Sequence, residues 1–224
     1  MICLSLCVAA FVPSLRLVSH SQPARVSLRV QSAVLQGDIP GERGPSSAAV
    51  PRPLLYANAA TKWVVVAAQT TAVLTRQDFV SPYIVIGSIA AAFGTAALKR
   101  IINQQRPAGA PFTDPGMPSS HALVATFAAT AWAIQLQDPI IRSLLVAVAA
   151  TISILRVATG YHTWPQVGVG SLLGAGGAWA WMVLNPTAGV AAPGPLAMGT
   201  VYASYVLGSA LFVLRKMRSW SAKR

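Results

Sequence analysis

Charged residues are scarce in this chain, and acidic ones are scarcest. Of its 224 residues, 10% are charged and 54% are hydrophobic, whereas soluble domains usually carry about 25% charged residues. This deficit favours an integral membrane protein. After residue 52 the only acids are Asp78, Asp114 and Asp138. So few carboxylates leave little to hold Mg²⁺, which binds through oxygen ligands, and we expect no metal and no other cofactor.

Cysteine pairs and glycosylation signals are lacking too. Both cysteines, Cys3 and Cys7, lie at the extreme N-terminus, so the body of the chain has no pair for a disulfide. Cys-x3-Cys alone is also a poor metal signature. Asn185 precedes Pro186, which rules out Asn-Pro-Thr as a glycosylation acceptor. None of these absences favours the secretory route.

The chain also lacks a basic run interleaved with aromatic residues, the usual platform for single-stranded nucleic acid. Twelve Lys and Arg residues follow residue 52. Most of them lie at the ends of apolar segments, where they orient a membrane protein. We therefore expect the bilayer as a partner and no nucleic acid.

Residues 1–52 differ in character from the rest. No acid precedes Asp38, serine is frequent, and five arginines are spread along the segment. Such a composition is typical of an organelle transit peptide. Two alternatives stay open: a disordered tail, and a secretory signal over Ile2–Phe11 that lacks a basic start. We predict a transit peptide or disordered N-terminus over 1–52 and a membrane domain over 53–224.

Six apolar stretches follow, and each approaches the ~20 residues that a helix needs to cross a bilayer. They cover residues 54–75, 79–98, 120–137, 139–158, 164–184 and 195–214. Lys62 interrupts the first, so its charge must snorkel or the span must be short and tilted. Only Gln137 and Asp138 join the third and fourth, which predicts a tight hairpin. The predicted fold is all-α, a bundle of about six transmembrane helices.

The fifth stretch is rich in glycine. Small residues at helical spacing usually let membrane helices pack closely, and we favour that interpretation over a ligand-binding one. The residues concerned are Gly168, Gly170, Gly174, Gly176 and Gly177.

The connections 99–119 and 159–163 fall on the same side of a six-span bundle as both termini. That side carries most of the cations, and the other has Arg76 and Arg142. The positive-inside rule then places both connections on the cytosolic or stromal face. A five-span arrangement would move only the N-terminus across.

The first of these connections holds residues suited to binding an anion. Lys99 and Arg106 precede Ser119, Ser120 and His121, which stand where the third apolar stretch begins. Ser119 has the position of an N-cap, and the free N–H groups of a helix N-terminus attract anions. The plainer alternative, a simple cap beside an interfacial His121, leaves Lys99 and Arg106 unexplained.

Arg156 and His162 flank the second connection, on the same predicted face. Together with Lys99 and Arg106, Arg156 can neutralise a phosphate dianion as charge shifts in the transition state. Two histidines then divide the remaining work, because one can attack phosphorus and the other can protonate the leaving oxygen. The sequence thus predicts a phosphoryl-transfer site whose activity survives EDTA.

Three motifs carry a family resemblance. Lys99-x6-Arg106-Pro107, Pro118-Ser119-Ser120-His121 and Arg156-x5-His162 resemble, in order, the signature motifs of the type 2 phosphatidic acid phosphatase (PAP2) superfamily. The resemblance spans residues 99–166 and implies a helical membrane core. It makes Lys99, Arg106 and Arg156 phosphate ligands, assisted by Ser119 and the Ser120 backbone. It also makes His162 the nucleophile and His121 the acid–base residue.

Gln166 departs from the usual superfamily pattern, which has Asp four residues after the nucleophilic histidine. A Gln carbonyl can still accept an imidazole N–H and fix the tautomer, but it adds no full charge. Thr163-Trp164-Pro165-Gln166 also has the form of a capping box with Gln166 at N3. Both roles of Gln166 stay open.

The segments 116–121 and 162–167 are similar to the branch that contains dolichyl diphosphatases and the plant chloroplast epsilon-type lipid phosphate phosphatases, where Gln occupies this position. With the predicted transit peptide, the resemblance implies a phosphatidic acid phosphatase in a chloroplast membrane. We expect the inner envelope, with the site facing the stroma, and the endoplasmic reticulum is the alternative location.

Other functions stay open beside this one. The nearest alternative is a polyprenyl or dolichyl diphosphate phosphatase with the same chemistry. In another class stands a non-catalytic membrane transporter or scaffold that keeps the motifs. The superfamily also resembles vanadate-dependent haloperoxidases, which the many predicted spans argue against. The oligomeric state is not predicted.

Overall fold

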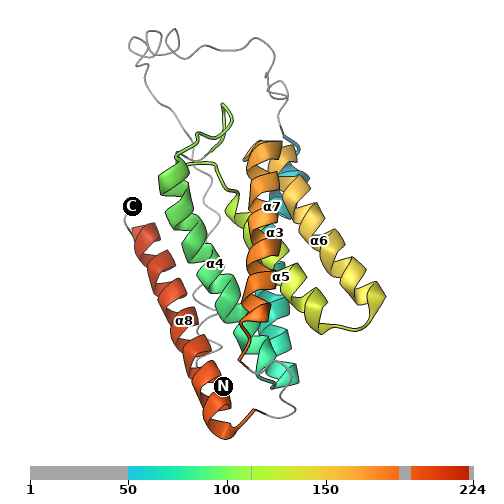
Figure 1. Ribbon diagram of the computed structural model, residues 1–224. Helices are drawn as coiled ribbons and strands as arrows, with labels where there is room; N and C mark the ends of the chain where they lie inside the picture. Colours follow the sequence, from blue (N-terminus) through green and yellow to red (C-terminus); the bar gives the residue numbers. More distant parts are fainter. Residues whose placement is uncertain (1–49, 112, 187–192, 222–224) are drawn as a thin grey trace, which may run out of the picture. The chain divides into compact units, whose positions relative to one another are not determined.

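The computed structural model describes residues 50–111, 113–186 and 193–221. The predicted N-terminal segment 1–52 therefore lies almost wholly outside the described residues. Within them the chain forms six α-helices and no strand (Figure 1). Their bounds follow the six predicted apolar stretches closely: α3 (Arg52–Arg76), α4 (Val80–Ile102), α5 (Ser120–Gln135), α6 (Pro139–Ala158), α7 (Trp164–Val183) and α8 (Pro195–Ser221).

The hairpin between α5 and α6 shows how local sequence sets the helix ends. Pro139 occupies the first turn of α6, where its missing N–H costs no hydrogen bond. Asp138 caps that turn, because its Oδ1 accepts from the backbone N–H of Ile140 at 2.8 Å and of Ile141 at 3.3 Å. The tight hairpin predicted from the sequence is confirmed.

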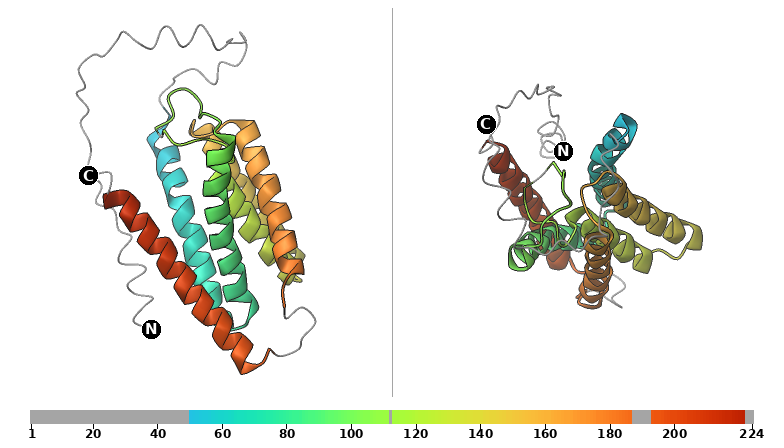
Figure 2. Two further views of the ribbon diagram at one scale, coloured as in Figure 1. Left: turned by 60° about the vertical axis from the view of Figure 1, so that its left-hand side comes forward. Right: turned by 90° about the horizontal axis from the view of Figure 1, so that it is seen from above.

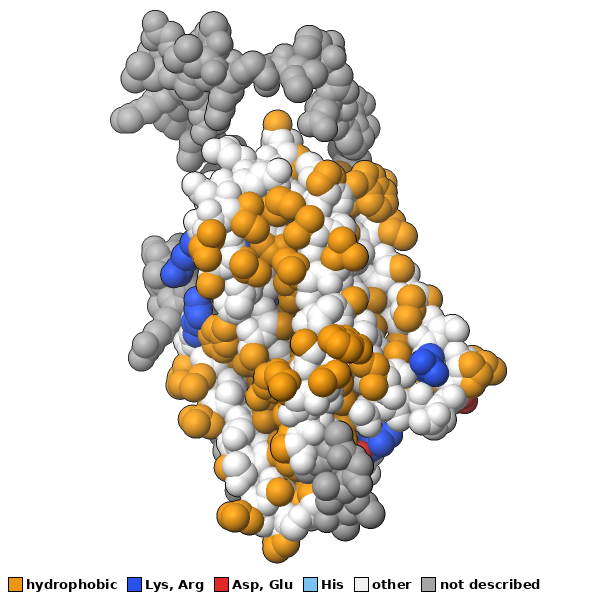
Figure 3. Space-filling model, in the orientation of Figure 1, with side chains coloured by type: hydrophobic (Ala, Val, Ile, Leu, Met, Phe, Trp, Pro, Cys, Tyr) orange, Lys and Arg blue, Asp and Glu red, His pale blue; other side chains and the backbone are white. Residues whose placement is uncertain are grey.

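The surface of these helices is apolar and part of their interior is polar. Large side chains such as Leu172 and Trp179 are well exposed, while Asn58, Thr61 and Gln69 of α3 are buried. Apolar side chains are spread over the face seen in Figure 3, with few charges among them. This arrangement suits a hydrocarbon solvent, in which polar groups must find partners inside the protein.

Three of the described helices are long and apolar enough to cross a bilayer: α4, α6, and α8 over Pro195–Arg215. The central helix α5 has only 16 residues, which is short of the ~20 that a full crossing takes. In α3, three of the four buried side chains are polar, so the buried face of this helix is less apolar than that of the others.

The helix α5 is the core of the bundle, packing on α7, α6 and α4. Two glycines of α7 allow the closest approach. A Cβ at Gly170 would lie 2.7 Å from the carbonyl oxygen of Ser119, and one at Gly174 would collide with the carbonyl oxygen of Leu123. The packing role is thus confirmed for these two glycines. The other three of the stretch have open space or only ordinary contacts around them.

Successive helices run in alternating directions, with α8 beside α4 (Figures 1 and 2). Three parts of the chain therefore meet at one end of the bundle. They are the C-terminal end of α4, the start of α5 and the connection between α6 and α7. As predicted, the connections 99–119 and 159–163 lie together, and hydrogen bonds from Arg106 join them.

Candidate active site

Arg106 is the residue that ties the two connections to each other. Its Nε donates to the backbone oxygen of Asp114 at 3.0 Å, within the first connection. Its Nη1 donates to the backbone oxygen of Tyr161 at 3.0 Å, within the second, and lies 3.1 Å from Nε2 of His162. The guanidinium therefore sits directly in front of the imidazole.

The tautomer of His162 follows from these contacts. A guanidinium only donates hydrogen bonds, so Nε2 of His162 is the acceptor and carries a lone pair toward Arg106. The proton then resides on Nδ1, which donates to Oε1 of Gln166 at 3.1 Å. Burial, followed by the positive charges of Arg106 and Arg156, lowers the pKa of His162 from 6.5 to about 3. The ring is consequently neutral at pH 7.

Hydrogen bonds orient the side-chain amide of Gln166. Its Nε2 donates to the backbone oxygen of Gln105 at 2.8 Å and to Oε1 of Gln104 at 3.2 Å. Its Oε1 accepts from the backbone N–H of Thr163 at 3.2 Å, which is half of the capping box at the start of α7. With the amide nitrogen held by two acceptors, the oxygen must face His162. Gln166 thus makes both contacts that the sequence left open.

Ser119 is the N-cap residue of α5, as the sequence predicts, but its hydroxyl makes no capping bond. The side chain is fully buried, and its backbone N–H donates to the carbonyl oxygen of Gln166 at 3.0 Å. Among the described residues, Oγ of Ser119 has no hydrogen-bond partner. A buried hydroxyl without a partner costs about 1–3 kcal/mol, so this hydroxyl is a candidate hydrogen-bond donor for a ligand. Ser120 and His121 follow in the first turn of α5, both half-buried.

Arg156 is buried where α6 ends. Its Nη1 donates to Oδ1 of Asn58 on α3 at 3.0 Å, and its guanidinium lies 4.6 Å from the centre of the Tyr161 ring. Its Nε is buried without a partner in the described part of the chain. The backbone oxygen of Arg156 accepts from the N–H groups of Tyr161 and His162, in a turn that uses the positive φ of Gly160. The turn therefore sets His162 close to Arg156.

One carboxylate oxygen bridges the other two cations. Oδ2 of Asp114 lies 2.9 Å from Nζ of Lys99 and 2.9 Å from Nη2 of Arg106. Partial burial alone would raise the pKa of Asp114, but hydrogen bonds from Lys99 and Arg106 outweigh it and hold the pKa below its usual value. The carboxylate side chain is 52% exposed, so it can leave. Its position marks where an anionic oxygen is bound by both cations.

The predicted site residues thus gather at one end of the bundle. Direct bonds link Lys99, Arg106, His162 and Gln166 with each other or through Asp114, and a backbone bond adds Ser119. No group of three His, Cys, Asp or Glu side chains able to hold a metal occurs in the parts of the chain that the structure describes.

Three participants were missed by the sequence reasoning: Asp114, Gln104 and Asn58. Asp114 had a signal, because it is the only acid between Asp78 and Asp138. Asn58 had one too, as an amide inside an apolar stretch. For Gln104, among neighbouring polar residues, nothing in the sequence marks its contact.

Comparison with known proteins identifies the family of the chain. The family model described as PAP2 superfamily matches residues 49–189, which include every residue of the site. The chain belongs to the PAP2 superfamily. Five of the six described helices, α3 to α7, lie completely within the matched residues of the PAP2 model, and α8 lies outside them.

Two curated proteins from Arabidopsis thaliana are similar to this PAP2 chain. Lipid phosphate phosphatase epsilon 2, chloroplastic, is 32% identical over 160 residues, which cover 68% of this chain and 54% of that protein. Lipid phosphate phosphatase epsilon 1, chloroplastic, is 34% identical over 126 residues, which cover 53% of this chain and 45% of that protein. The chain spans about half the length of these relatives. No solved structure matches it.

Proposed function

We propose that this chain is an integral membrane phosphatase that hydrolyses phosphatidic acid to diacylglycerol and phosphate through a phosphohistidine, without a metal. The observation that carries the proposal is the neutral, buried His162, whose Nε2 lone pair faces Arg106 among further cations. The names of the two relatives support a lipid phosphate as substrate. Membrane-length helices support a substrate whose tails stay in the bilayer.

The first step is binding of the phosphate. The dianion displaces the Asp114 carboxylate and takes the hydrogen bonds of Lys99 and Arg106. The unpartnered Nε of Arg156 and hydroxyl of Ser119 supply two more donors, and the Ser120 backbone adds another at the start of α5. Such donors are held in place before the reaction, so they stabilise charge on the equatorial oxygens without reorganising.

The second step is attack by His162. Its Nε2 lone pair forms a bond to phosphorus while the bond from phosphorus to the glycerol oxygen breaks. His121 donates a proton to that oxygen, and diacylglycerol leaves. The imidazole becomes positively charged on phosphorylation, and Oε1 of Gln166 stabilises the Nδ1–H through its hydrogen bond.

The third step removes the phosphoryl group. His121, now neutral, takes a proton from water as the water oxygen attacks phosphorus. The bond from phosphorus to Nε2 breaks, inorganic phosphate leaves, and His162 returns to its neutral form. Each histidine therefore ends the cycle in the protonation state in which it began.

The experiment follows the phosphoryl group. Full-length protein in micelles is mixed briefly with ³²P-labelled phosphatidic acid in EDTA and quenched in alkali, which preserves phosphohistidine. We expect wild type and His121→Ala to retain label on His162, and His162→Ala to lose both label and turnover. Full phosphatase activity in His162→Ala would overturn the mechanism.

The same assay separates the alternative functions. A faster reaction with a polyprenyl diphosphate than with phosphatidic acid would assign the chain to that substrate. If neither lipid is hydrolysed although folded protein binds phosphate, the non-catalytic alternative gains support.

The location is a further part of the proposal. We propose that residues 1–52 direct the chain to a chloroplast membrane, most simply the inner envelope, with the domain 53–224 presenting its site to the stroma. The chloroplastic relatives support this assignment. Import of a reporter fused to residues 1–52 by isolated chloroplasts tests it, and failure to import would favour the endoplasmic reticulum.

A further inference from the structure

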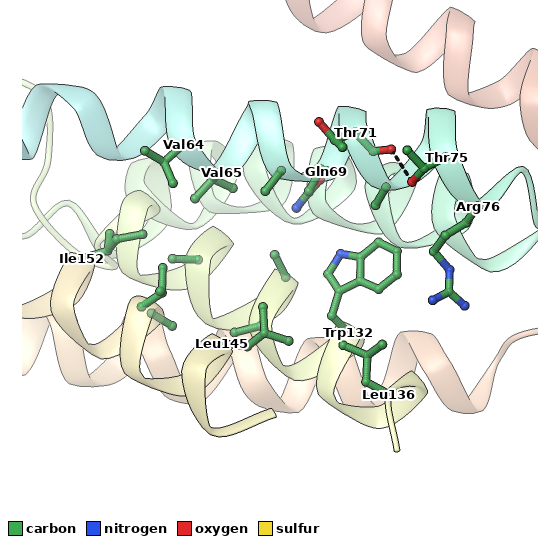
Figure 4. Close-up of a pocket in the computed structure, with 17 residues that line it drawn as sticks. Val64, Val65, Gln69, Thr71, Thr75, Arg76, Trp132, Leu136, Leu145 and Ile152 are labelled. Atoms are coloured by element: carbon green, nitrogen blue, oxygen red, sulfur yellow. Dashed lines mark hydrogen bonds between the residues drawn. The ribbon is translucent and has the colours of Figure 1, made fainter. Parts of the chain in front are cut away.

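An elongated, mostly apolar groove lies between α3, α5 and α6. Its volume is about 370 Å³, and most of its lining is aliphatic, including Val65, Ala129, Leu145 and Ile152. Figure 4 shows Val65, Leu145 and Ile152 on facing helices, and the ring of Trp132 lies in the same space. A space of this kind excludes polar ligands, because they would lose their hydrogen bonds to water.

The groove opens on the outer surface of the helix bundle. Val64 and Val148 both line it and are 57% and 47% exposed, and Ala68 lines it from the exposed side of α3. The surface around the opening is apolar. A hydrocarbon chain can therefore reach the groove sideways without crossing water.

The groove begins next to the phosphate site. Ile152 lines it and lies one helical turn before Arg156, on the same buried face of α6. The hydrogen bond from Arg156 to Asn58 spans α3 and α6, and Val65 stands two turns after Asn58 on α3. The end of the groove at Ile152 would thus lie about one helical turn, or about 5 Å along α6, from a phosphate held by Arg156.

Polar side chains in the lining are few, and Gln69, Thr75 and Arg76 among them have partners. Nε of Arg76 lies 2.8 Å from Oδ2 of Asp78. Nε2 of Gln69 donates to Oγ of Ser88 at 3.3 Å, and the Thr75 hydroxyl donates to the backbone oxygen of Thr71 at 2.8 Å. The lining from Val64 to Arg76 covers 13 residues of α3, and the 12 rises between the first and the last amount to roughly 18 Å. The groove is thus long and mostly apolar.

We propose that this groove holds one hydrocarbon chain of the lipid whose phosphate occupies the site. The inference rests on the proposed function, since it takes the phosphate to be that of a lipid. It assigns α3 a role in substrate selection, because α3 supplies one wall of the groove and, through Asn58, the partner of a phosphate-binding arginine. The second chain of a diacyl lipid remains in the bilayer.

Two neighbouring alanines provide a matched test. Ala68 lines the groove and Ala67 does not, and both are exposed on α3. In Ala68→Phe the added ring fills part of the groove, so a long lipid chain loses apolar contacts there. We expect the KM for long-chain phosphatidic acid to rise by about tenfold. Its activity on a short-chain, water-soluble phosphatidic acid should stay unchanged. Ala67→Phe should resemble wild type with both substrates.

A second measurement locates the chain directly. Full-length protein in liposomes is irradiated with a phosphatidic acid that carries a diazirine in one acyl chain, and the adducts are mapped by mass spectrometry. We expect adducts on groove residues of α3 and α6 that Ala68→Phe reduces. Equal labelling by a phosphatidylcholine with the same diazirine chain would show bulk lipid contact only and overturn the proposal.

The two proposals fail in different ways. If wild type hydrolyses neither the long-chain nor the short-chain lipid, the proposed function is wrong. If wild type hydrolyses both and Ala68→Phe leaves their ratio unchanged, the phosphatase assignment stands and the groove proposal is wrong.

Discussion

The Nδ1–H of His162 points at the side-chain oxygen Oε1 of Gln166, 3.1 Å away. This contact keeps the proton on Nδ1, so that the Nε2 lone pair faces Arg106. An amide does here what a carboxylate does in many His–carboxylate pairs, namely fix the tautomer. It does so without adding a charge, so the pKa of His162 stays low.

Gln166→Glu tests the role of the missing charge. A carboxylate beside Nδ1–H favours the imidazolium, so the pKa of His162 should rise from about 3 by about 1–3 pH units. The pH dependence of His162 carbethoxylation by diethyl pyrocarbonate, which modifies only neutral imidazole, measures the shift. Gln77→Glu, on the exposed turn after α3, is the control. An unchanged or lower midpoint in Gln166→Glu would contradict the assigned tautomer.

Ser119→Ala separates function from stability. Removing a buried hydroxyl that has no partner among the described residues should leave the thermal unfolding temperature in micelles unchanged or higher. We expect kcat/KM to fall about tenfold, as for a lost transition-state donor worth ~1.4 kcal/mol. Ser88→Ala is the opposite case, because Oγ of Ser88 is hydrogen-bonded to Gln69 and to the backbone of Ile84. It should lower stability and spare activity.

Asp114→Asn tests whether the carboxylate competes with phosphate. The substitution removes the negative charge that bridges Lys99 and Arg106, so both cations become available to an incoming anion. We expect inorganic phosphate to inhibit several-fold more strongly, with a lower inhibition constant. Asp78→Asn, whose carboxylate pairs with Arg76 at the start of α4, should leave the constant unchanged. Weaker inhibition in Asp114→Asn would mean that Asp114 positions the cations instead.

Gly174→Ala tests the packing of α5 on α7. A Cβ there collides with the backbone of Leu123, and such overpacking typically costs about 1–3 kcal/mol. The unfolding temperature should fall clearly. At Gly176, where a Cβ meets nothing within 4 Å, alanine should be neutral or slightly stabilising because it favours the helix. Equal stability of the two variants would show that α5 and α7 are less tightly packed.

Much of the fold was predictable because apolar stretches and helix breakers are local signals. The α6 helix spans the predicted residues 139–158, since Asp138 and Pro139 mark its start. The bounds of α4 and α8 were predicted too short at their C-terminal ends, where the helix continues through basic residues that interrupt the apolar pattern. Propensity and tertiary packing decide such ends, and hydropathy does not reveal them.

Part of the candidate site was predictable for a different reason. Lys99, Arg106, Arg156 and His162 are recognisable because charges and imidazoles are rare in apolar surroundings. Their contacts were not predictable. The bridge through Asp114 depends on the path of a loop, and the bond from Arg156 to Asn58 joins residues 98 positions apart.

By itself, the sequence determined the apolar helices, their order, and which residue types stand at one end of the bundle, because these depend on composition and spacing along the chain. Only the tertiary structure decided which nitrogen of His162 carries the proton and which way the Gln166 amide faces. Both depend on atoms of Arg106, Gln104 and Gln105, which folding brings from a distant segment to within hydrogen-bonding distance. The groove beside Arg156 likewise exists only because three helices pack around it.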